Sequence, residues 1–206
     1  MHKDQAHLGL NVTVAWPWPS HFEPAYLAFA ERLATLDPGL YVYPFSTSHV
    51  TLLTAVNFRQ HVDPSAEVTR SVGEASEKLG AFVMETTRAM PPFTLDFGVP
   101  VLARAAAFVP IQNRTGEIAM LRQRTLAFCR SAGGALSNAS APTSIHSTIV
   151  RFRELPPDAL AFAQAFAQLS HTFRLGSATI DRVLVTLETK PYMRAGRVVE
   201  SAPLGT

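Results

Sequence analysis

The stretch SHVTLLTAV, residues 48–56, mixes aliphatic, β-branched and small polar side chains in the manner of a β-strand. Successive side chains of a strand point to opposite faces of its sheet, so His49 and Thr51 are predicted to project from the same face. Imidazole and hydroxyl groups both need hydrogen-bond partners, which makes such a face poor material for a hydrophobic core. We therefore expect this strand to form one wall of a polar cleft.

The stretch IHSTIVRF, residues 145–152, repeats the arrangement with His146 and Thr148. Each half of the chain shows a helix, a short link, the H-x-T strand, a second helix and closing strands. Outside the motif the halves share little sequence, so the repeat is one of topology. We expect residues 1–206 to form a single bilobal domain, with each half supplying one H-x-T lobe and both lobes sharing one cleft.

Hydrophobic periodicity predicts the other elements of an α+β fold. Further strands are expected at residues 10–16, 41–45, 93–98, 101–111, 178–189 and 197–204. Helices are expected over 26–36, from 63–64 until before Pro91, from 115 until 133, and from Pro157 onward. Asp63 is the expected N-cap of the second of these helices.

The composition is that of an ordinary globular protein, with 47% hydrophobic and 17% charged residues. A formal charge of +2 suits a small anion or a short nucleic-acid end, but not a grip on long duplexes, where many phosphates must be neutralised. Cys129 is the single cysteine and cannot form an internal disulfide. No export signal or long apolar run is evident, so we expect a cytoplasmic protein that makes no membrane contact.

A cleft between two H-x-T walls suits phosphodiester chemistry. Histidine titrates near neutrality, so one copy can be neutral while the other is protonated. The neutral ring would take a proton from an attacking water or ribose hydroxyl, and the protonated ring would give one to the leaving oxygen. The threonine hydroxyls would bind the non-bridging oxygens as negative charge collects there.

The segments HVTL (49–52) and HSTI (146–149) resemble the two H-x-[ST]-hydrophobic motifs of the two-histidine (2H) phosphoesterase superfamily. That superfamily includes RNA 2′,3′-cyclic phosphodiesterases, bacterial 2′-5′ RNA-ligase-like proteins and 2′,5′-oligonucleotide phosphodiesterases. The resemblance covers most of the chain, from the opening strand to the terminal strand that ends in SAPL. It implies a bilobal, pseudo-twofold α+β fold in which two antiparallel sheets line a central groove and the helices lie outside.

The resemblance also implies roles for individual residues. His49 and His146 would be the catalytic acid and base, and Thr51 and Thr148 would bind phosphate. An arginine follows the second motif in a common form of the family, which points to Arg151 as a further phosphate ligand. In a regular strand Arg151 would face away from the groove, so it needs a bend or bulge to reach phosphate.

The chain departs from the family pattern in its first strand. Many relatives carry an arginine there, whereas this chain has Asn11 and Thr13. The departure bears on substrate preference more than on the chemistry.

Aromatic residues near the motifs or in the C-terminal stretch are candidates for stacking on a base or lining the groove. They are Tyr43, Phe45, Phe152 and Tyr192. The remaining histidines show no metal-ligand spacing, and no glycine-rich phosphate loop occurs, so we expect neither a metal nor another cofactor.

The leading hypothesis is a metal-independent phosphodiesterase that opens 2′,3′-cyclic phosphates of RNA ends or nucleotides, leaving 2′-phosphates, as in RNA processing. The same site would serve a 2′,5′-oligonucleotide or RNA 3′-end phosphodiesterase, and a catalytically lapsed nucleotide- or RNA-binding module is an alternative of another class. The expected partner is a nucleotide or short RNA end bound by a monomer. Which histidine is the base, and which linkage is cleaved, stay open at this point.

Overall fold

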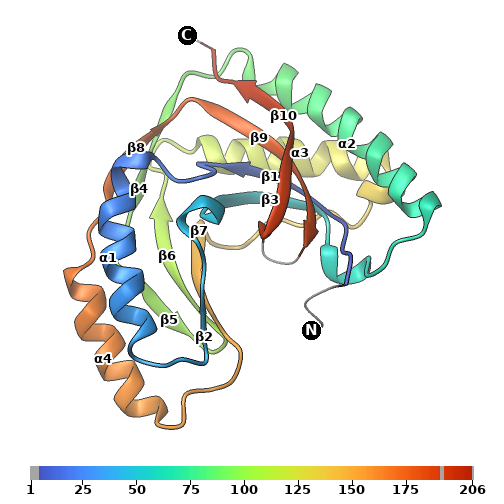
Figure 1. Ribbon diagram of the computed structural model, residues 1–206. Coiled ribbons are helices and arrows are strands. Elements are labelled where there is room, and N and C mark those ends of the chain that lie inside the picture. The colour runs from blue at the N-terminus through green and yellow to red at the C-terminus, as the bar shows by residue number, and fades with distance from the viewer. Residues whose placement is uncertain (1–4, 191–192, 206) are drawn as a thin grey trace.

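The computed structural model describes residues 5–190 and 193–205 of the chain (Figure 1). Its strands are β1 (Gly9–Val14), β2 (Leu40–Val42), β3 (Val50–Val56), β4 (Phe93–Phe97), β5 (Val101–Ala103), β6 (Ala106–Gln112), β7 (His146–Phe152), β8 (Gly176–Ile180), β9 (Arg182–Lys190) and β10 (Ala195–Pro203). Its longer helices are α1 (Glu23–Ala34), α2 (Ala66–Thr87), α3 (Glu117–Ala132) and α4 (Ala159–Thr172). The expected α+β class is confirmed.

The strands form two antiparallel sheets. The four-stranded sheet has the order β10-β9-β1-β3, and the six-stranded sheet has the order β2-β7-β6-β4-β8 with β5 beside β6. β3 is an edge strand, and only the short β2 lies outside β7. β3 and β7 meet at the centre of the molecule, so the two H-x-T motifs come together where the sheets adjoin (Figure 1).

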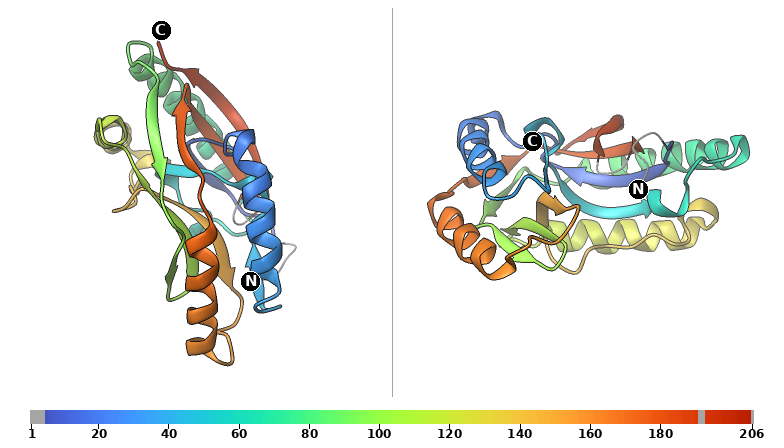
Figure 2. Two further views of the ribbon diagram at one scale, coloured as in Figure 1. Left: turned by 90° about the vertical axis from the view of Figure 1, so that its left-hand side faces the viewer. Right: turned by 60° about the horizontal axis from the view of Figure 1, so that its bottom comes forward.

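Each lobe contains segments from both halves of the sequence. We call the four-stranded sheet with α2 and α3 the β3 lobe, and the six-stranded sheet with α1 and α4 the β7 lobe. α1 precedes β3 in the chain but packs against α4 and β2, whereas α3 precedes β7 but packs against α2 and β3 (Figures 1 and 2). This differs from the expectation that each sequence half supplies one lobe.

Apolar helix faces explain this exchange. The ring of Phe29 on α1 lies 4.5 Å from that of Phe173, at the end of α4. The ring of Phe128 on α3 stacks on Phe82 of α2 at 4.3 Å. α1 and α3 therefore pack where their apolar faces can be buried, and each lies in the lobe opposite to the H-x-T strand that follows it in the chain.

Two predicted strands are divided in the structure. Residues 178–189 break at Asp181 into β8 and β9, which belong to different sheets. Residues 101–111 form the hairpin β5–β6. Because β8 pairs with β4 while β9 pairs with β1, the chain near Asp181 links the two lobes.

The N-cap of α2 is Ser65 rather than the expected Asp63. The Ser65 hydroxyl accepts a hydrogen bond from the backbone N–H of Val68 at 3.2 Å. Asp63 lies two residues earlier with a φ of +48°, and its carboxylate accepts from the backbone N–H of Ala6 at 3.1 Å. Asp63 therefore joins the N-terminal segment to the loop before α2.

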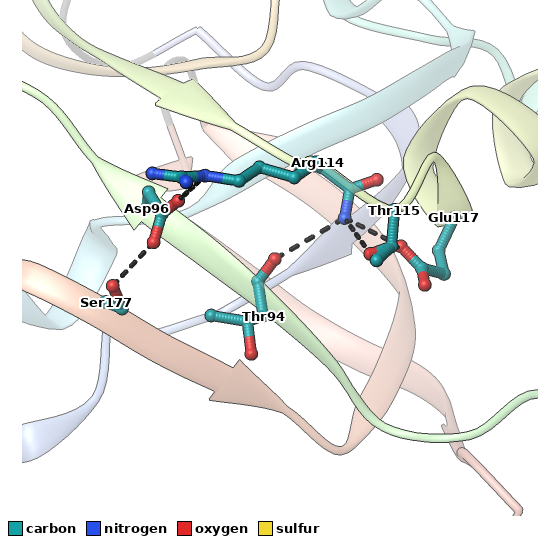
Figure 3. Close-up of polar contacts among 7 residues, drawn as sticks. Thr94, Asp96, Arg114, Thr115, Glu117 and Ser177 are labelled. Atoms are coloured by element: carbon teal, nitrogen blue, oxygen red, sulfur yellow. Dashed lines mark hydrogen bonds and ion pairs between the residues drawn. The ribbon is translucent and has the colours of Figure 1, made fainter.

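A polar cluster fixes the beginning of α3 (Figure 3). The Asp96 carboxylate on β4 accepts from Ser177 of β8 at 2.5 Å and from Arg114 at 2.7 Å, and these hydrogen bonds lower the pKa of Asp96. The side-chain amide of Asn113 donates to Glu117, in the first turn of α3, at 2.7 Å. These contacts tie α3, which reaches the site described below, to the β7 lobe. No helix among residues 5–190 and 193–205 is long and apolar enough to cross a bilayer.

Candidate active site

Strand β3 carries a bulge directly after the first H-x-T motif. Thr51 and Leu53 pair with adjacent residues of β1, so Leu52 is an extra residue in β3. Leu52 and Leu53 are both buried, and Thr54 returns to the face that Thr51 occupies. His49, Thr51 and Thr54 consequently line one cavity.

Strand β7 contains the same irregularity after the second motif. Thr148 and Val150 pair with adjacent residues of β6, which makes Ile149 the extra residue. Ile149 and Val150 are buried, and Arg151 rejoins the face of Thr148. The bulge that Arg151 was expected to need is therefore present, and Arg151 lines the same cavity as His146 and Thr148.

The cavity has a volume of about 240 Å³. It brings together all five residues that the sequence singled out for proton transfer and phosphate binding: His49, Thr51, His146, Thr148 and Arg151. The rest of its wall is formed by Asn11, Tyr43, Thr54, Asn57, Phe58, Arg59, Pro142, Glu188 and Met193. The wall is thus mostly polar and draws on both lobes.

The imidazole of His49 is oriented by its own chain. Nδ1 lies 2.8 Å from the carbonyl oxygen of Thr47, and because a carbonyl can only accept, Nδ1 carries a proton. In the neutral ring, Nε2 is then the nitrogen with a free lone pair. Burial lowers the pKa of His49, the nearby His146 lowers it further, and the hydrogen bond to Thr47 acts in the opposite direction.

His146 has a similar support on its own strand. Its Nδ1 lies 3.0 Å from the hydroxyl oxygen of Ser144, and its ring lies 5.0 Å from that of Phe108. Burial lowers the pKa of His146, and the positive charges of Arg122 and Arg151 lower it further, against a hydrogen bond at Ser144 that raises it. A bound anion would offset these cations and favour the protonated ring.

Arg122 of α3 forms hydrogen bonds with both H-x-T segments. Its Nε donates to the carbonyl of Leu52 at 3.1 Å, and one terminal nitrogen donates to the carbonyls of Thr51 at 3.2 Å and Ser144 at 3.1 Å. Burial lowers the pKa of the guanidinium. Arg122 therefore ties the two H-x-T segments together, which no local sequence pattern could indicate.

Glu188 is a second residue that the sequence did not indicate. Its side chain lies in the cavity wall, only 3% exposed. The backbone N–H of Met193 donates to Oε1 at 2.7 Å, and the amide of Asn11 donates to Oε2 at 3.5 Å. Asn11 of the first strand thus contacts a buried carboxylate, and this side of the cavity suits hydrogen-bond donors better than phosphate oxygens.

The four aromatic candidates have different positions. Tyr43 lines the cavity. Phe45 is buried in an aromatic cluster of the core, since the helical turn at residues 45–47 directs it inward. Phe152 packs against α4, and neither of these phenylalanines lines the cavity. Tyr192 lies outside the described residues.

In the part of the chain that the structure describes, no three His, Cys, Asp or Glu side chains gather closely enough to hold a metal ion. No protein-family model matches the sequence, and no curated protein matches it either. Solved structures do match over nearly the full length of the chain.

TT0787 of Thermus thermophilus is 16% identical, with a TM-score of 0.61 over 95% of this chain and 97% of its own. LigT of E. coli in its apo form is 14% identical, with a TM-score of 0.59 over 98% of this chain and all of its own. A structure described as a phosphoesterase is 16% identical, with a TM-score of 0.56 over 97% and 99% of the two chains. LigT has also been solved in complex with phosphate, 3′-AMP and ATP.

At these identities the likeness establishes the fold. The chain has the LigT-like α+β fold with two antiparallel sheets, which confirms the fold that the resemblance to the two-histidine phosphoesterases implied.

Proposed function

We propose that this protein is a phosphodiesterase that hydrolyses 2′,3′-cyclic phosphates at RNA ends or on nucleotides. The observation that carries the proposal is the cavity itself, in which His49 and Thr51 of one sheet and His146 and Thr148 of the other line a single space. Two histidines can serve as the general base that takes a proton from the attacking water and as the general acid that gives one to the leaving oxygen.

The proposed reaction uses these groups as follows. One imidazole, in its neutral form, takes a proton from a water molecule that attacks phosphorus. The bond from phosphorus to the ribose 3′-oxygen breaks, the other imidazole gives that oxygen a proton, and a 2′-phosphate remains. Nδ1 of each ring is hydrogen-bonded to its own chain, so Nε2 is the nitrogen available for these transfers.

The remaining polar groups would stabilise the charge that collects on the non-bridging oxygens. The hydroxyls of Thr51 and Thr148 can donate to them, and Arg151 supplies a full positive charge. Support for a phosphate-bearing substrate comes from the shared fold with LigT, which has been solved with phosphate and with 3′-AMP.

The proposal is tested by turnover of a panel of substrates in EDTA. The panel contains 2′,3′-cyclic nucleotides, 3′,5′-cyclic nucleotides, a 2′,5′-linked oligoadenylate and RNA with a free 3′ end. We expect turnover of the 2′,3′-cyclic substrates in the presence of the chelator, with a loss of at least about a hundredfold in His49→Ala and in His146→Ala. His171→Ala, on the exposed end of α4, is the matched control and should keep the parent rate.

Each other outcome has a definite meaning. A parent rate in either cavity variant would rule out the proposed proton transfers. Cleavage of only the 2′,5′-linked member or of the RNA 3′ end would assign the same site to another linkage. Tight nucleotide binding without turnover of any member would identify a binding module.

A further inference from the structure

The face of β7 that carries the histidine continues outward beyond the cavity. Arg153 follows Arg151 by two residues, and its backbone N–H still donates to the carbonyl of Gly39, so the strand pairing with the β2 segment extends to it. Arg151 and Arg153 are therefore on the same face, about 7 Å apart along the strand. Tyr41 of β2 is the register partner of Arg151 and shares that face.

Tyr41 brings a second arginine to this place from the other lobe. The guanidinium carbon of Arg153 lies 5.7 Å from the centre of the Tyr41 ring, and that of Arg194 lies 5.8 Å from it. Arg194 belongs to the connection between β9 and β10, next to Met193 in the cavity wall. We call Tyr41, Arg153 and Arg194 the rim cluster.

The rim cluster adjoins the cavity directly. The rings of Tyr41 and Tyr43 lie 5.2 Å apart, and Tyr43 lines the cavity. Each member of the rim cluster is therefore next to a residue of the cavity wall: Arg153 to Arg151, Arg194 to Met193, and Tyr41 to Tyr43. A chain that leaves the phosphate site along β7 would meet the rim cluster first.

Among the described residues, no carboxylate forms an ion pair with either arginine of the rim cluster. In the described residues, the carboxylate ion pairs are those of Arg114 with Asp96 and Arg182 with Asp181, so neither cluster arginine has one. Arg153 and Arg194 are both exposed. The two guanidinium carbons lie 5.7 and 5.8 Å from the centre of one ring, so an anion placed beside that ring is attracted by both positive charges.

A net charge of +2 spread over 206 residues leaves little general attraction for nucleic acid. Arg151, Arg153 and Arg194 instead concentrate positive charge at one end of the cavity, where they form a local site for an anion. Guanidinium groups bind phosphate oxygens in a bidentate manner and also stack on bases, so a nucleotide fits this site better than a simple anion does.

We propose that the rim cluster binds the phosphodiester next to the terminal nucleotide, so that the preferred ligand is a single-stranded RNA end and not a free nucleotide. The terminal phosphate occupies the cavity, and the adjoining phosphodiester lies between Arg153 and Arg194. This inference rests on the proposed function for the identity of the terminal group, but its residues lie outside the catalytic cavity.

The test measures binding and turnover separately. Binding uses fluorescence anisotropy of a labelled four-nucleotide RNA that ends in a 2′-phosphate, with the corresponding 2′-phosphate mononucleotide as competitor. We expect the double variant Arg153→Ala/Arg194→Ala to bind the RNA at least about tenfold more weakly and to bind the mononucleotide within about twofold of the parent. The double variant Arg124→Ala/Arg130→Ala, which removes two exposed arginines of α3 that do not line the cavity, is the charge-matched control and should bind both ligands like the parent.

Salt dependence provides an independent measurement. The two arginines together neutralise one phosphodiester, so their loss should reduce the slope of log affinity against log salt by about 0.7 for a single strand. Equal weakening of RNA and mononucleotide binding, or no more weakening of RNA binding than in Arg124→Ala/Arg130→Ala, would overturn the inference, whether or not the protein turns over a substrate. RNA binding that depends on the two arginines, without turnover of the matching 2′,3′-cyclic RNA, would support the rim cluster while the proposed function fails.

Discussion

In β3 and β7 alike, a histidine is hydrogen-bonded through Nδ1 to the residue two places before it, Thr47 in one case and Ser144 in the other. In both, a threonine follows two places later, and a bulge then brings the fifth residue after the histidine back onto the same face. That fifth residue is Thr54 in the β3 lobe and Arg151 in the β7 lobe. The two strands therefore share their backbone construction and differ in the charge they present.

This difference in charge allows two walls of similar backbone structure to bind different parts of one ligand. Under the proposed function, the β7 wall neutralises phosphate charge, because Arg151 is there and Arg153 of the rim cluster follows it along the same strand. Arg59 lines the cavity from the turn after β3, but β3 itself offers only its histidine and the hydroxyls of Thr51 and Thr54. Beyond it, Glu188 and Asn11 favour hydrogen-bond donors of the ligand.

The comparison is tested most strongly at the fifth positions. Arg151→Met should lower kcat/KM by about a hundredfold, since a charge-assisted contact to the developing charge is lost. Thr54→Val, the matched change on the other wall, should lower it by roughly three- to tenfold, the value of one neutral hydrogen bond. Steady-state kinetics on a 2′,3′-cyclic nucleotide measures both, and equal losses would mean that the walls are electrostatically equivalent.

A smaller effect is expected where the two walls are tied together. Arg122→Met removes hydrogen bonds to carbonyls of both H-x-T segments, so we expect about a tenfold loss of kcat and a decrease of about 2 kcal/mol in the free energy of unfolding. Urea denaturation measures the second quantity. Arg122→Lys keeps the charge and should restore part of the activity, whereas a parent-like Arg122→Met would show that the segments hold their positions without this contact.

The smallest effect concerns the pH profile. Catalysis needs one neutral and one protonated histidine, and both pKa values are lowered from 6.5, so kcat/KM should fall as pH rises through the higher of the two, with its maximum below 6.5. Arg151→Met removes a charge that lowers the pKa of His146 and should move the falling limb to higher pH if that limb belongs to His146. A maximum above pH 7 in the parent would contradict this assignment of shifts.

Part of the fold and site could be predicted because it depends on local geometry. The alternation of a strand puts His49 with Thr51 and His146 with Thr148, whatever surrounds them. The bulges also left a trace in the sequence: Leu52–Leu53 and Ile149–Val150 are adjacent apolar pairs where regular alternation would place one polar residue. With that trace, Thr54 could have been grouped with Arg151.

Other features depend on contacts between distant segments. Phe45 precedes the motif by four residues, yet a helical turn sends it into the core and not toward the ligand. Arg122 has the spacing of an exposed helix residue, and only the packing of α3 against β3 brings it to the carbonyls of both motifs. Glu188 lies in an apolar strand and reaches the cavity because β9 pairs with β1.

The sequence by itself determined which side chains share a face of each H-x-T strand, because that follows from the backbone period of two residues. It also determined that the chain is α+β, because the spacing of apolar residues distinguishes helices from strands. Only the tertiary structure decided which helix packs in which lobe, and which carboxylate and cations surround the histidines. These depend on burying apolar faces that lie far apart in the chain, and no local pattern records which of them will meet.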